Sequence, residues 1–255
     1  MWPFKKNKKP AQTSEPIVNS ILCIPGLWPS IDELTNTVFA SNNGEWMIVG
    51  DIMFNPKTQH HYNIKITGHD ESMRESFRVA GSITRIPEEC LDKIQKNTFV
   101  VYISCKTGNL PDAYQLALAG AAILKAGGLG VRVETTGKAF DKQKWLQHIK
   151  NFEETDLFEM FVINTIVDNK GTTFSCGMHN LGLKDTIVSG LDFQTAVDLI
   201  SIFGYYQIFE KPVILAGQTF QPNFQSPKYC VSEELNQPYK GSAYYGNPFG
   251  MWRLS

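Results

Sequence analysis

The pair of residues best placed for chemistry lies in the segment Cys176-Gly177-Met178-His179. A cysteine and a histidine this close together supply half of a tetrahedral zinc site, which needs about four ligands. The other histidines form no second pair with a cysteine (His60, His61, His69 and His148), so we predict no metal site. A cysteine nucleophile activated by a histidine stays open, because such partners meet only in the folded chain. The alternative is a structural role at the end of a strand.

Two glycine-containing segments are candidates for phosphate binding. A phosphate loop runs from a strand into a helix, so that the free N–H groups of the helix point at the anion. Residues 126–130 instead follow a helical pattern and precede a strand, which is typical of a helix C-cap and a tight turn. Residues 25–30 lie between a strand and a helix, but they contain one glycine and two prolines, which lack an N–H donor. We therefore predict no bound phosphate or other cofactor.

The chain carries no recognisable catalytic signature. It lacks the sequence patterns of a catalytic triad, a Walker loop and a dinucleotide-binding loop, and no spacing pairs two carboxylates as acid and base. The sequence therefore favours a non-catalytic binding protein with no catalytic residues. Two alternatives stay open, an enzyme with a Cys/His-based site and a regulatory module that binds a small ligand.

Aromatic residues gather near the C-terminus, at Tyr239, Tyr244, Tyr245, Phe249 and Trp252. Glycine and proline interrupt this segment, so we expect irregular structure there. Tyrosine and tryptophan are enriched at the energetic centres of protein interfaces, which makes these five residues the candidate partner-binding residues. The alternative is a strap that packs over the core and ends the fold.

Charge and composition limit the class of protein. The chain has 255 residues and a formal net charge of −1, whereas proteins that bind DNA or anionic membranes normally carry a basic stripe. Its one basic run lies within residues 5–9. No signal peptide or membrane-spanning stretch is apparent. We expect a soluble cytoplasmic protein with no nucleic-acid or membrane partner.

The predicted domain organisation is simple. Residues 1–19 are polar and basic, and we expect a disordered lead-in there. Residues 20–255 are expected to form a single α+β domain, with a possible subdomain boundary near residues 151–156. The five cysteines are odd in number and scattered, so we predict reduced thiols and no disulfide framework.

Helix starts are well marked in this sequence. Ser30 and Ser72 each precede a glutamate by three residues, the pattern of a capping box, and further helices are predicted to begin at Pro87 and Asp141. The two longest helical patterns cover residues 109–126 and 192–209. We expect both helices to pack against sheet, with Leu124, Val197 and Ile200 buried; Gln207 shares the apolar spacing of the second helix.

The remaining apolar runs predict strands. They cover residues 21–24, 45–54, 61–67, 98–104, 130–135, 159–167, 172–178, 213–220 and 228–232, and a turn signal at residues 168–171 makes two of them a hairpin. The order of strands and helices is not a regular βαβ alternation. The sequence therefore predicts an α+β fold with mixed or antiparallel sheets and packed helices, possibly as two similar halves.

Several segments together resemble an uncharacterised bacterial family that is catalogued as domain of unknown function 4261. They are residues 23–28, 127–131, 176–185 and the closing 247–252, and the resemblance spans residues 21–254. None of these segments is a catalytic signature. The family pattern usually carries a proline before the aspartate of the third segment, where this chain has Lys184 before Asp185.

The resemblance implies a function in toxin immunity. Members of the family occur near secreted polymorphic toxins, so this chain is expected to be an antitoxin-like protein of the bacterial cytoplasm. Such a protein inhibits a cognate protein toxin by direct binding, which requires no catalytic residue, metal or cofactor. The sequence predicts neither the identity of the toxin nor the oligomeric state.

Overall fold

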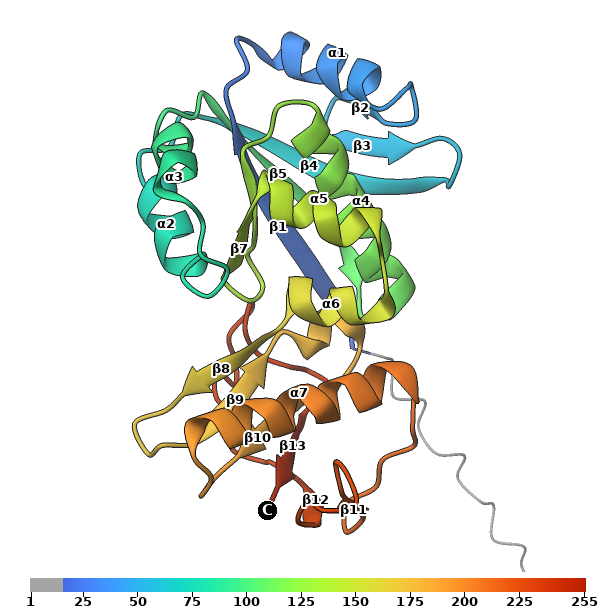
Figure 1. The fold of residues 1–255 in the computed structure, drawn as a ribbon. Helices are drawn as coiled ribbons and strands as arrows, with labels where there is room; N and C mark the ends of the chain where they lie inside the picture. The colour runs from blue at the N-terminus through green and yellow to red at the C-terminus, as the bar shows by residue number, and fades with distance from the viewer. Residues whose placement is uncertain (1–15) are drawn as a thin grey trace, which may run out of the picture.

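The computed structural model describes residues 16–255, which form two β-sheets with helices packed on them (Figure 1). Residues 1–15 of the predicted lead-in lie outside the described residues, and the first strand begins at Val18. The fold class is α+β, as the sequence predicted.

The first sheet has the strand order β2-β3-β4-β5-β1-β6-β7, and all its neighbouring strands are antiparallel. The long central strands β1 and β5 pair along nine residues, from Val18 opposite Thr107 to Gly26 opposite Phe99. The strands are β1 (Val18–Gly26), β2 (Met47–Val49), β3 (Ile52–Asn55), β4 (His60–Gly68), β5 (Phe99–Thr107), β6 (Gly130–Val133) and β7 (Lys138–Asp141).

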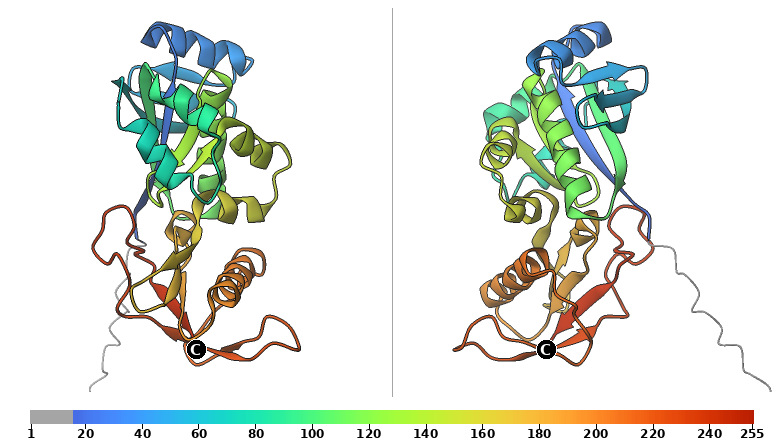
Figure 2. Two further views of the ribbon diagram at one scale, coloured as in Figure 1. Left: turned by 60° about the vertical axis from the view of Figure 1, so that its left-hand side comes forward. Right: turned by 90° about the vertical axis from the view of Figure 1, so that its right-hand side faces the viewer.

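Helices cover both faces of this sheet. Because side chains alternate along a strand, Leu22 and Ile24 of β1 point to one face and Cys23 points to the other, and all three are fully buried. The helices α1 (Ile31–Ser41), α4 (Leu110–Lys125) and α5 (Lys142–Lys150) share a core with Leu22 and Ile24. The helices α2 (Met73–Ala80) and α3 (Glu88–Gln95) share a core with Cys23. Figure 2 shows α4 lying along the sheet.

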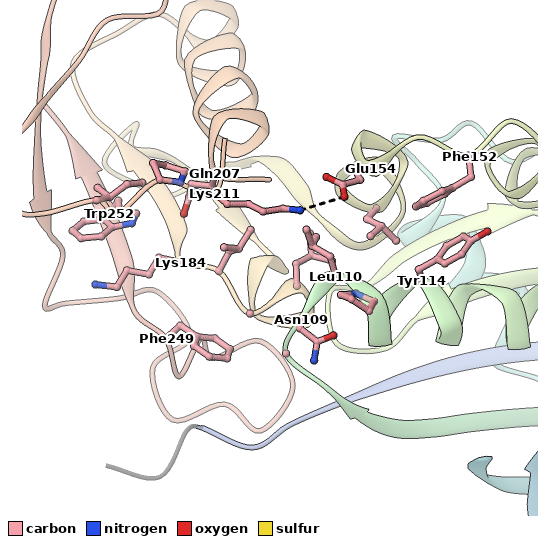
Figure 3. A pocket seen from close by; sticks show the side chains of 18 residues that line it. Asn109, Leu110, Tyr114, Phe152, Glu154, Lys184, Gln207, Lys211, Phe249 and Trp252 are labelled. Carbon is pink, nitrogen blue, oxygen red and sulfur yellow. Dashed lines mark hydrogen bonds and ion pairs between the residues drawn. The ribbon is translucent and has the colours of Figure 1, made fainter. Parts of the chain in front are cut away.

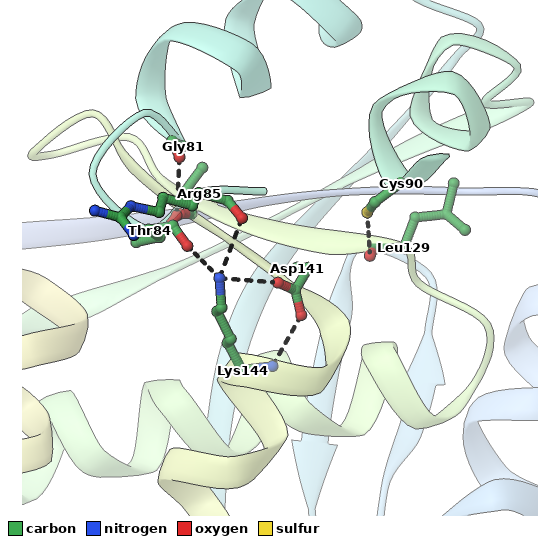
Figure 4. Close-up of polar contacts among 8 residues, drawn as sticks. Gly81, Thr84, Arg85, Cys90, Leu129, Asp141 and Lys144 are labelled. Carbon is green, nitrogen blue, oxygen red and sulfur yellow. Dashed lines mark hydrogen bonds and ion pairs between the residues drawn. The ribbon is translucent and has the colours of Figure 1, made fainter. Parts of the chain in front are cut away.

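Local hydrogen bonds hold the helix starts as the sequence predicted. Ser30, Asn109 and Asp192 each accept a hydrogen bond from the backbone N–H three residues later. Asp141 caps α5 in the same way, at 2.9 Å from the N–H of Lys144, and the ammonium of Lys144 donates to the carbonyl of Thr84 beyond α2 (Figure 4). The start of α5 is thereby attached to the loop after α2.

The second sheet has the strand order β11-β12-β13-β10-β9-β8, in which β10 and β13 are parallel and the other neighbours antiparallel. Helix α6 lies between the two halves, and the long helix α7 packs over the second sheet (Figure 1). The elements are α6 (Glu154–Phe161), β8 (Ile163–Val167), β9 (Thr173–Cys176), the 3-10 turn η1 (Met178–Leu181), β10 (Asp185–Val188), α7 (Phe193–Phe209), β11 (Thr219–Phe220), β12 (Tyr229–Glu233) and β13 (Met251–Leu254).

The strand predicted over residues 159–167 was wrong in its first part, which belongs to α6. That helix begins where the carboxylate of Asp156 accepts a hydrogen bond from the backbone N–H of Glu153, at 2.7 Å. Phe158 and Phe161 are buried in the core that α6 shares with the first half. A short apolar run does not distinguish a buried helix from a buried strand, which explains the error.

Several other local predictions were wrong. Residues 213–218 form no strand, and the closing segment, predicted to be irregular, contains β13. The hydroxyl of Ser72 bonds to Asp70 at 2.6 Å and makes no cap for α2. Leu124 and Ile200 are buried, but Val197 is only half-buried. The predicted strand over residues 45–54 is divided at Gly50 into β2 and β3.

Candidate functional site

A candidate site is a cleft of about 890 Å³ between the two halves of the chain (Figure 3). Five separate segments form its walls: the start of α4, the start of α6, the segment from η1 to β10, the end of α7 and the C-terminal segment. Its lining is mainly apolar, with Leu110, Leu157, Leu181, Leu183 and Ile214 among its residues.

Aromatic rings lie at both ends of the cleft. Tyr114 of α4 and Phe152 stack with their ring centroids 4.0 Å apart, and Figure 3 shows them toward one end. Phe249 and Trp252 lie toward the other end. Phe249 is half-buried and Trp252 is 6% exposed. Two of the five predicted partner-binding residues thus line the cleft.

Two lysines and a glutamate are the charged residues of the lining. The ammonium of Lys184 lies 3.9 Å from the centroid of the Trp252 ring and 2.5 Å from a carboxylate oxygen of Glu233. The ammonium of Lys211, just beyond α7, lies 3.3 Å from a carboxylate oxygen of Glu154 at the start of α6. This second ion pair connects the two halves across the cleft.

A buried glutamine also lines the cleft. Gln207 of α7 is 4% exposed, and its side-chain NH₂ group has no hydrogen-bond partner among residues 16–255. A buried polar group without a partner costs about 1–3 kcal/mol, and the amide nitrogen itself has almost no exposed surface.

The segment that contains Cys176 and His179 joins the two halves. Asn180 of η1 is fully buried, and its side-chain oxygen accepts hydrogen bonds from Ser20 of β1 at 2.5 Å and from Thr135 after β6 at 2.8 Å. Gly182 has a φ of +76°, and a Cβ there would lie 2.1 Å from the carbonyl oxygen of Gly108. The segment therefore places the Asn180 side chain and Gly182 directly against the end of the first sheet.

Neither of the predicted reactive groups has the environment of a nucleophile. Cys176 is buried, its thiol lies 3.7 Å from the carbonyl of Tyr245, and burial raises its pKa well above the ordinary value. Burial lowers the pKa of His179 to about 4, which keeps the imidazole neutral. A reactive cysteine is normally a thiolate near a positive charge. The surroundings of Cys176 and His179 therefore favour the structural role.

Asp185, the last residue of the same segment, is a buried carboxylate. It accepts hydrogen bonds from Ser175 at 3.0 Å, from the backbone N–H of Met178 at 3.2 Å and from Asn247 at 2.7 Å. Burial nevertheless raises its pKa to about 6. Asp185 thereby ties β9, η1 and the C-terminal segment together below the cleft.

The two glycine segments considered for phosphate binding pack on each other. The indole of Trp28 donates a hydrogen bond to the carbonyl of Ala126 at 2.7 Å. A Cβ at Gly26 would lie 2.2 Å from the Trp28 ring, and one at Gly127 would lie 3.0 Å from its nitrogen. The space that a phosphate would need is filled by the indole, so both segments are structural.

The three predicted partner-binding tyrosines lie apart from the cleft lining. Tyr239, Tyr244 and Tyr245 are 46%, 50% and 38% exposed. The rings of Tyr239 and Tyr245 lie 5.6 Å apart and border a second cavity of about 450 Å³, which Cys176 also lines. Of the five predicted residues, two line the cleft, two border the second cavity, and Tyr244 lines neither.

Three further features of the described residues concern metals, thiols and membranes. No group of three or more His, Cys, Asp or Glu residues within residues 16–255 is placed to hold a metal ion. The five cysteines, all of them in the described part, are free thiols. No helix in that part of the chain is long and apolar enough to cross a membrane.

Sequence reasoning missed the cleft itself, because its walls come from segments far apart in the chain. One signal was present. Gln207 occupies an apolar position in the helical spacing of α7, and it lines the cleft.

Comparison with known proteins adds no further guide to function. No family model, no curated protein and no solved structure matches this chain.

Proposed function

We propose that this protein is a non-catalytic binding protein that takes a small, largely apolar ligand into the cleft between its halves. The observation that carries the proposal is the cleft of about 890 Å³. Small-molecule sites have volumes of about 300–1,000 Å³, are mostly apolar with a few convergent polar groups, and occur preferentially between domains. The cleft has each of these properties.

The driving force for such a ligand is the burial of apolar surface. Leucine side chains from α4, α6 and η1 and the rings of Phe249 and Trp252 provide that surface. Each ligand methylene that leaves water contributes about 0.8 kcal/mol. The two lysines of the lining supply polar groups that orient a ligand, as in other binding pockets.

The environments of Cys176 and His179 also favour binding over catalysis. Neither residue lines the cleft. A neutral thiol and a neutral imidazole held in a structural joint contribute no charge or nucleophile to a ligand there. The alternative of a Cys/His-based enzyme therefore receives no support from this cleft.

The test uses N-phenyl-1-naphthylamine, a neutral dye whose fluorescence rises in apolar surroundings. We expect saturable binding to the wild-type protein. Leu183→Trp combined with Ile214→Trp enlarges two side chains of the lining and should weaken binding at least about tenfold, which corresponds to the loss of contacts worth about two methylenes. The matched control is Leu215→Trp with Leu235→Trp, because both of these leucines are exposed (59% and 72%) and lie outside the cleft.

Two results would contradict the proposal. One is the absence of saturable dye binding to the folded wild-type protein. The other is equal binding by the cleft variant and the control variant, which would place the dye on another apolar surface. Circular dichroism of each variant establishes that it is folded.

The exposed tyrosines favour a second function, in which the protein is a cytoplasmic immunity protein that inhibits a cognate bacterial toxin. The resemblance to the family named above motivates this proposal. Tyr239, Tyr244 and Tyr245 lie exposed within one short segment, and tyrosines of this kind are typical anchors at interface centres. Inhibition by direct binding needs no nucleophile.

Co-expression with a toxin encoded beside this protein tests the second function. Tyr244→Ala should weaken toxin binding by about 2 kcal/mol, roughly thirtyfold. Protection should persist in Cys176→Ala and His179→Ala, provided that these variants fold. Loss of protection in either folded variant would favour the enzyme alternative, and full affinity in Tyr244→Ala would exclude this residue from the interface.

A further inference from the structure

We propose that the cleft selects an uncharged ligand, and that the ion pair between Lys211 and Glu154 is a determinant of that selectivity. This inference rests on the proposed function and identifies the class of its ligand. Figure 3 shows the ammonium of Lys211 directed at the carboxylate of Glu154. The two groups lie 3.3 Å apart, and the pair connects the end of α7 to the start of α6.

The charges of the lining are balanced by ion pairs. The charged residues of the lining are Lys184, Lys211 and Glu154. Lys211 is paired with Glu154, and Lys184 is paired at 2.5 Å with Glu233, which lies just outside the lining. Each ammonium group therefore has a carboxylate beside it. A ligand in the cleft meets no net charge from these four side chains.

The two ammonium groups do not act together on one charged head group. Figure 3 shows the side chains of Lys184 and Lys211 extending in opposite directions. The ammonium of Lys184 also lies 3.9 Å from the centroid of the Trp252 ring, a further favourable contact for its charge. At either lysine, an anionic ligand would have to compete with a carboxylate that is already in place.

The helix ends that border the cleft are balanced in the same way. A helix N-terminus favours an anion, and a helix C-terminus favours a cation. Asp112 lies in the first turn of α4 and Glu154 in the first turn of α6, so each N-terminus already has a carboxylate. Lys211 follows the C-terminus of α7. The dipole of each helix is therefore offset by a side chain of the protein itself.

A charged ligand would lose its hydration and find these partners already paired. Moving an ionised group out of water is unfavourable unless the group gains a counter-charge or hydrogen bonds. The lining is mainly apolar, with leucine and isoleucine side chains from several segments. An uncharged ligand avoids this cost, and a lysine in an ion pair keeps N–H donors for a neutral oxygen. The lining therefore favours uncharged molecules over anions and cations of the same length.

Displacement of the neutral dye by three ligands of one chain length tests the inference. At neutral pH 1-decanol is uncharged, decanoate is an anion and decylamine is a cation. We measure their inhibition constants with the full chain. The wild-type protein should bind 1-decanol at least about tenfold more tightly than either ion. It should bind the two ions about equally, because the charges around the cleft balance.

Two substitutions in the same ion pair have opposite expected effects. Glu154→Gln leaves Lys211 without its partner, so the affinity for decanoate relative to decylamine should rise about fivefold. Lys211→Met leaves Glu154 unpaired, so the same ratio should fall about fivefold. Because the ratio compares two ions in one protein, it is insensitive to a general change in the cleft. An apolar surface without this ion pair would also prefer 1-decanol, but it would not show the opposite shifts.

The matched control is Glu45→Gln. It removes a carboxylate from an exposed 2.6 Å ion pair with Lys57, and neither residue lines the cleft. The ratio should stay at its wild-type value in this variant. The side chains of Lys211 and Glu154 are 60% and 43% exposed, so their substitutions are expected to leave the core intact. Circular dichroism of each variant establishes that it is folded.

The outcomes separate this inference from the proposed function. If the dye binds in the cleft but either ion displaces it as well as 1-decanol does, the binding function stands and the selectivity inference is wrong. The same ratio in Glu154→Gln, Lys211→Met and the control also overturns the inference. If the dye shows no binding in the cleft, the proposed function fails and the inference fails with it.

Discussion

Removal of the Asn180 side chain should destabilise the protein and loosen the connection between its halves. The Asn180 side chain makes three hydrogen bonds, from Ser20 at 2.5 Å, from Thr135 at 2.8 Å and to the carbonyl of Gly177 at 2.9 Å. In Asn180→Ala, the hydroxyl of Ser20 keeps Thr107 as a partner at 2.6 Å. The buried hydroxyl of Thr135 loses its bond to Asn180.

The expected loss of stability is about 3 kcal/mol. Leaving one buried group unsatisfied costs about 1–3 kcal/mol, and each of the other two bonds contributes about 0.5–1.5 kcal/mol. Urea denaturation followed by circular dichroism measures the change in the free energy of unfolding. The matched control is Asn164→Ala, because Asn164 is half-buried and its side chain makes a single bond, to Ser201 at 2.7 Å; we expect a loss of about 1 kcal/mol.

A double-mutant cycle tests whether the bond across the two halves has this effect. Ser20→Ala and Asn180→Ala should be coupled by about 1 kcal/mol, within the range for residues in direct contact. The reasoning is refuted if Asn180→Ala destabilises the protein no more than Asn164→Ala does. It is also refuted if the two substitutions across the joint are additive.

Three further predictions concern pH, backbone conformation and thiol reactivity. Burial lowers the pKa of His179 from 6.5 to about 4. The unfolded chain therefore binds a proton at this imidazole more tightly than the folded chain does. Stability that is present at pH 7, where the imidazole is neutral in both states, is lost as the pH falls from about 6.5 to 4. Linkage gives about 2 kcal/mol between pH 7 and pH 5, which His179→Phe should remove from the urea-measured pH dependence; equal losses in both proteins would contradict this. Gly182→Ala should unfold the contact between the two halves or lower the free energy of unfolding by more than about 3 kcal/mol, because its Cβ would lie 2.1 Å from the carbonyl oxygen of Gly108. A melting temperature equal to that of the wild-type protein would exclude this close contact between Gly182 and Gly108. A thiol reagent should modify the exposed Cys230 quickly and the buried Cys176 only after unfolding, whereas rapid modification of native Cys176 in a Cys230→Ser background would support the enzyme alternative.

Local sequence patterns determined the helix starts and several turns of this protein. Ser30, Asn109, Asp141 and Asp192 were recognisable as caps because each bonds to a backbone N–H only three residues away. The turn between β8 and β9 was equally local, since Asp168 accepts hydrogen bonds from the N–H groups of residues 170 and 172. Interactions that close within a few residues depend little on the rest of the fold.

Tertiary structure decided the pairing of distant segments. β13 exists because residues 251–254 lie between β10 and β12 and pair with both, and the local sequence there shows only an aromatic-rich, glycine-interrupted segment. The α+β class was nevertheless predictable, because it depends on the order and type of the elements. Which strands become neighbours depends on how the whole chain buries its apolar surface.

The candidate site shows most clearly the difference between what the sequence and the tertiary structure each determine. The sequence identified Phe249 and Trp252 as aromatic residues available for binding. Only the fold brings these residues together with Lys184, Gln207 and Lys211 around one cleft. A cleft forms where the backbone segments around it remain separated. No periodicity or residue spacing along the chain predicts that separation. The residue types were therefore visible in the sequence, while their convergence was a property of the tertiary structure.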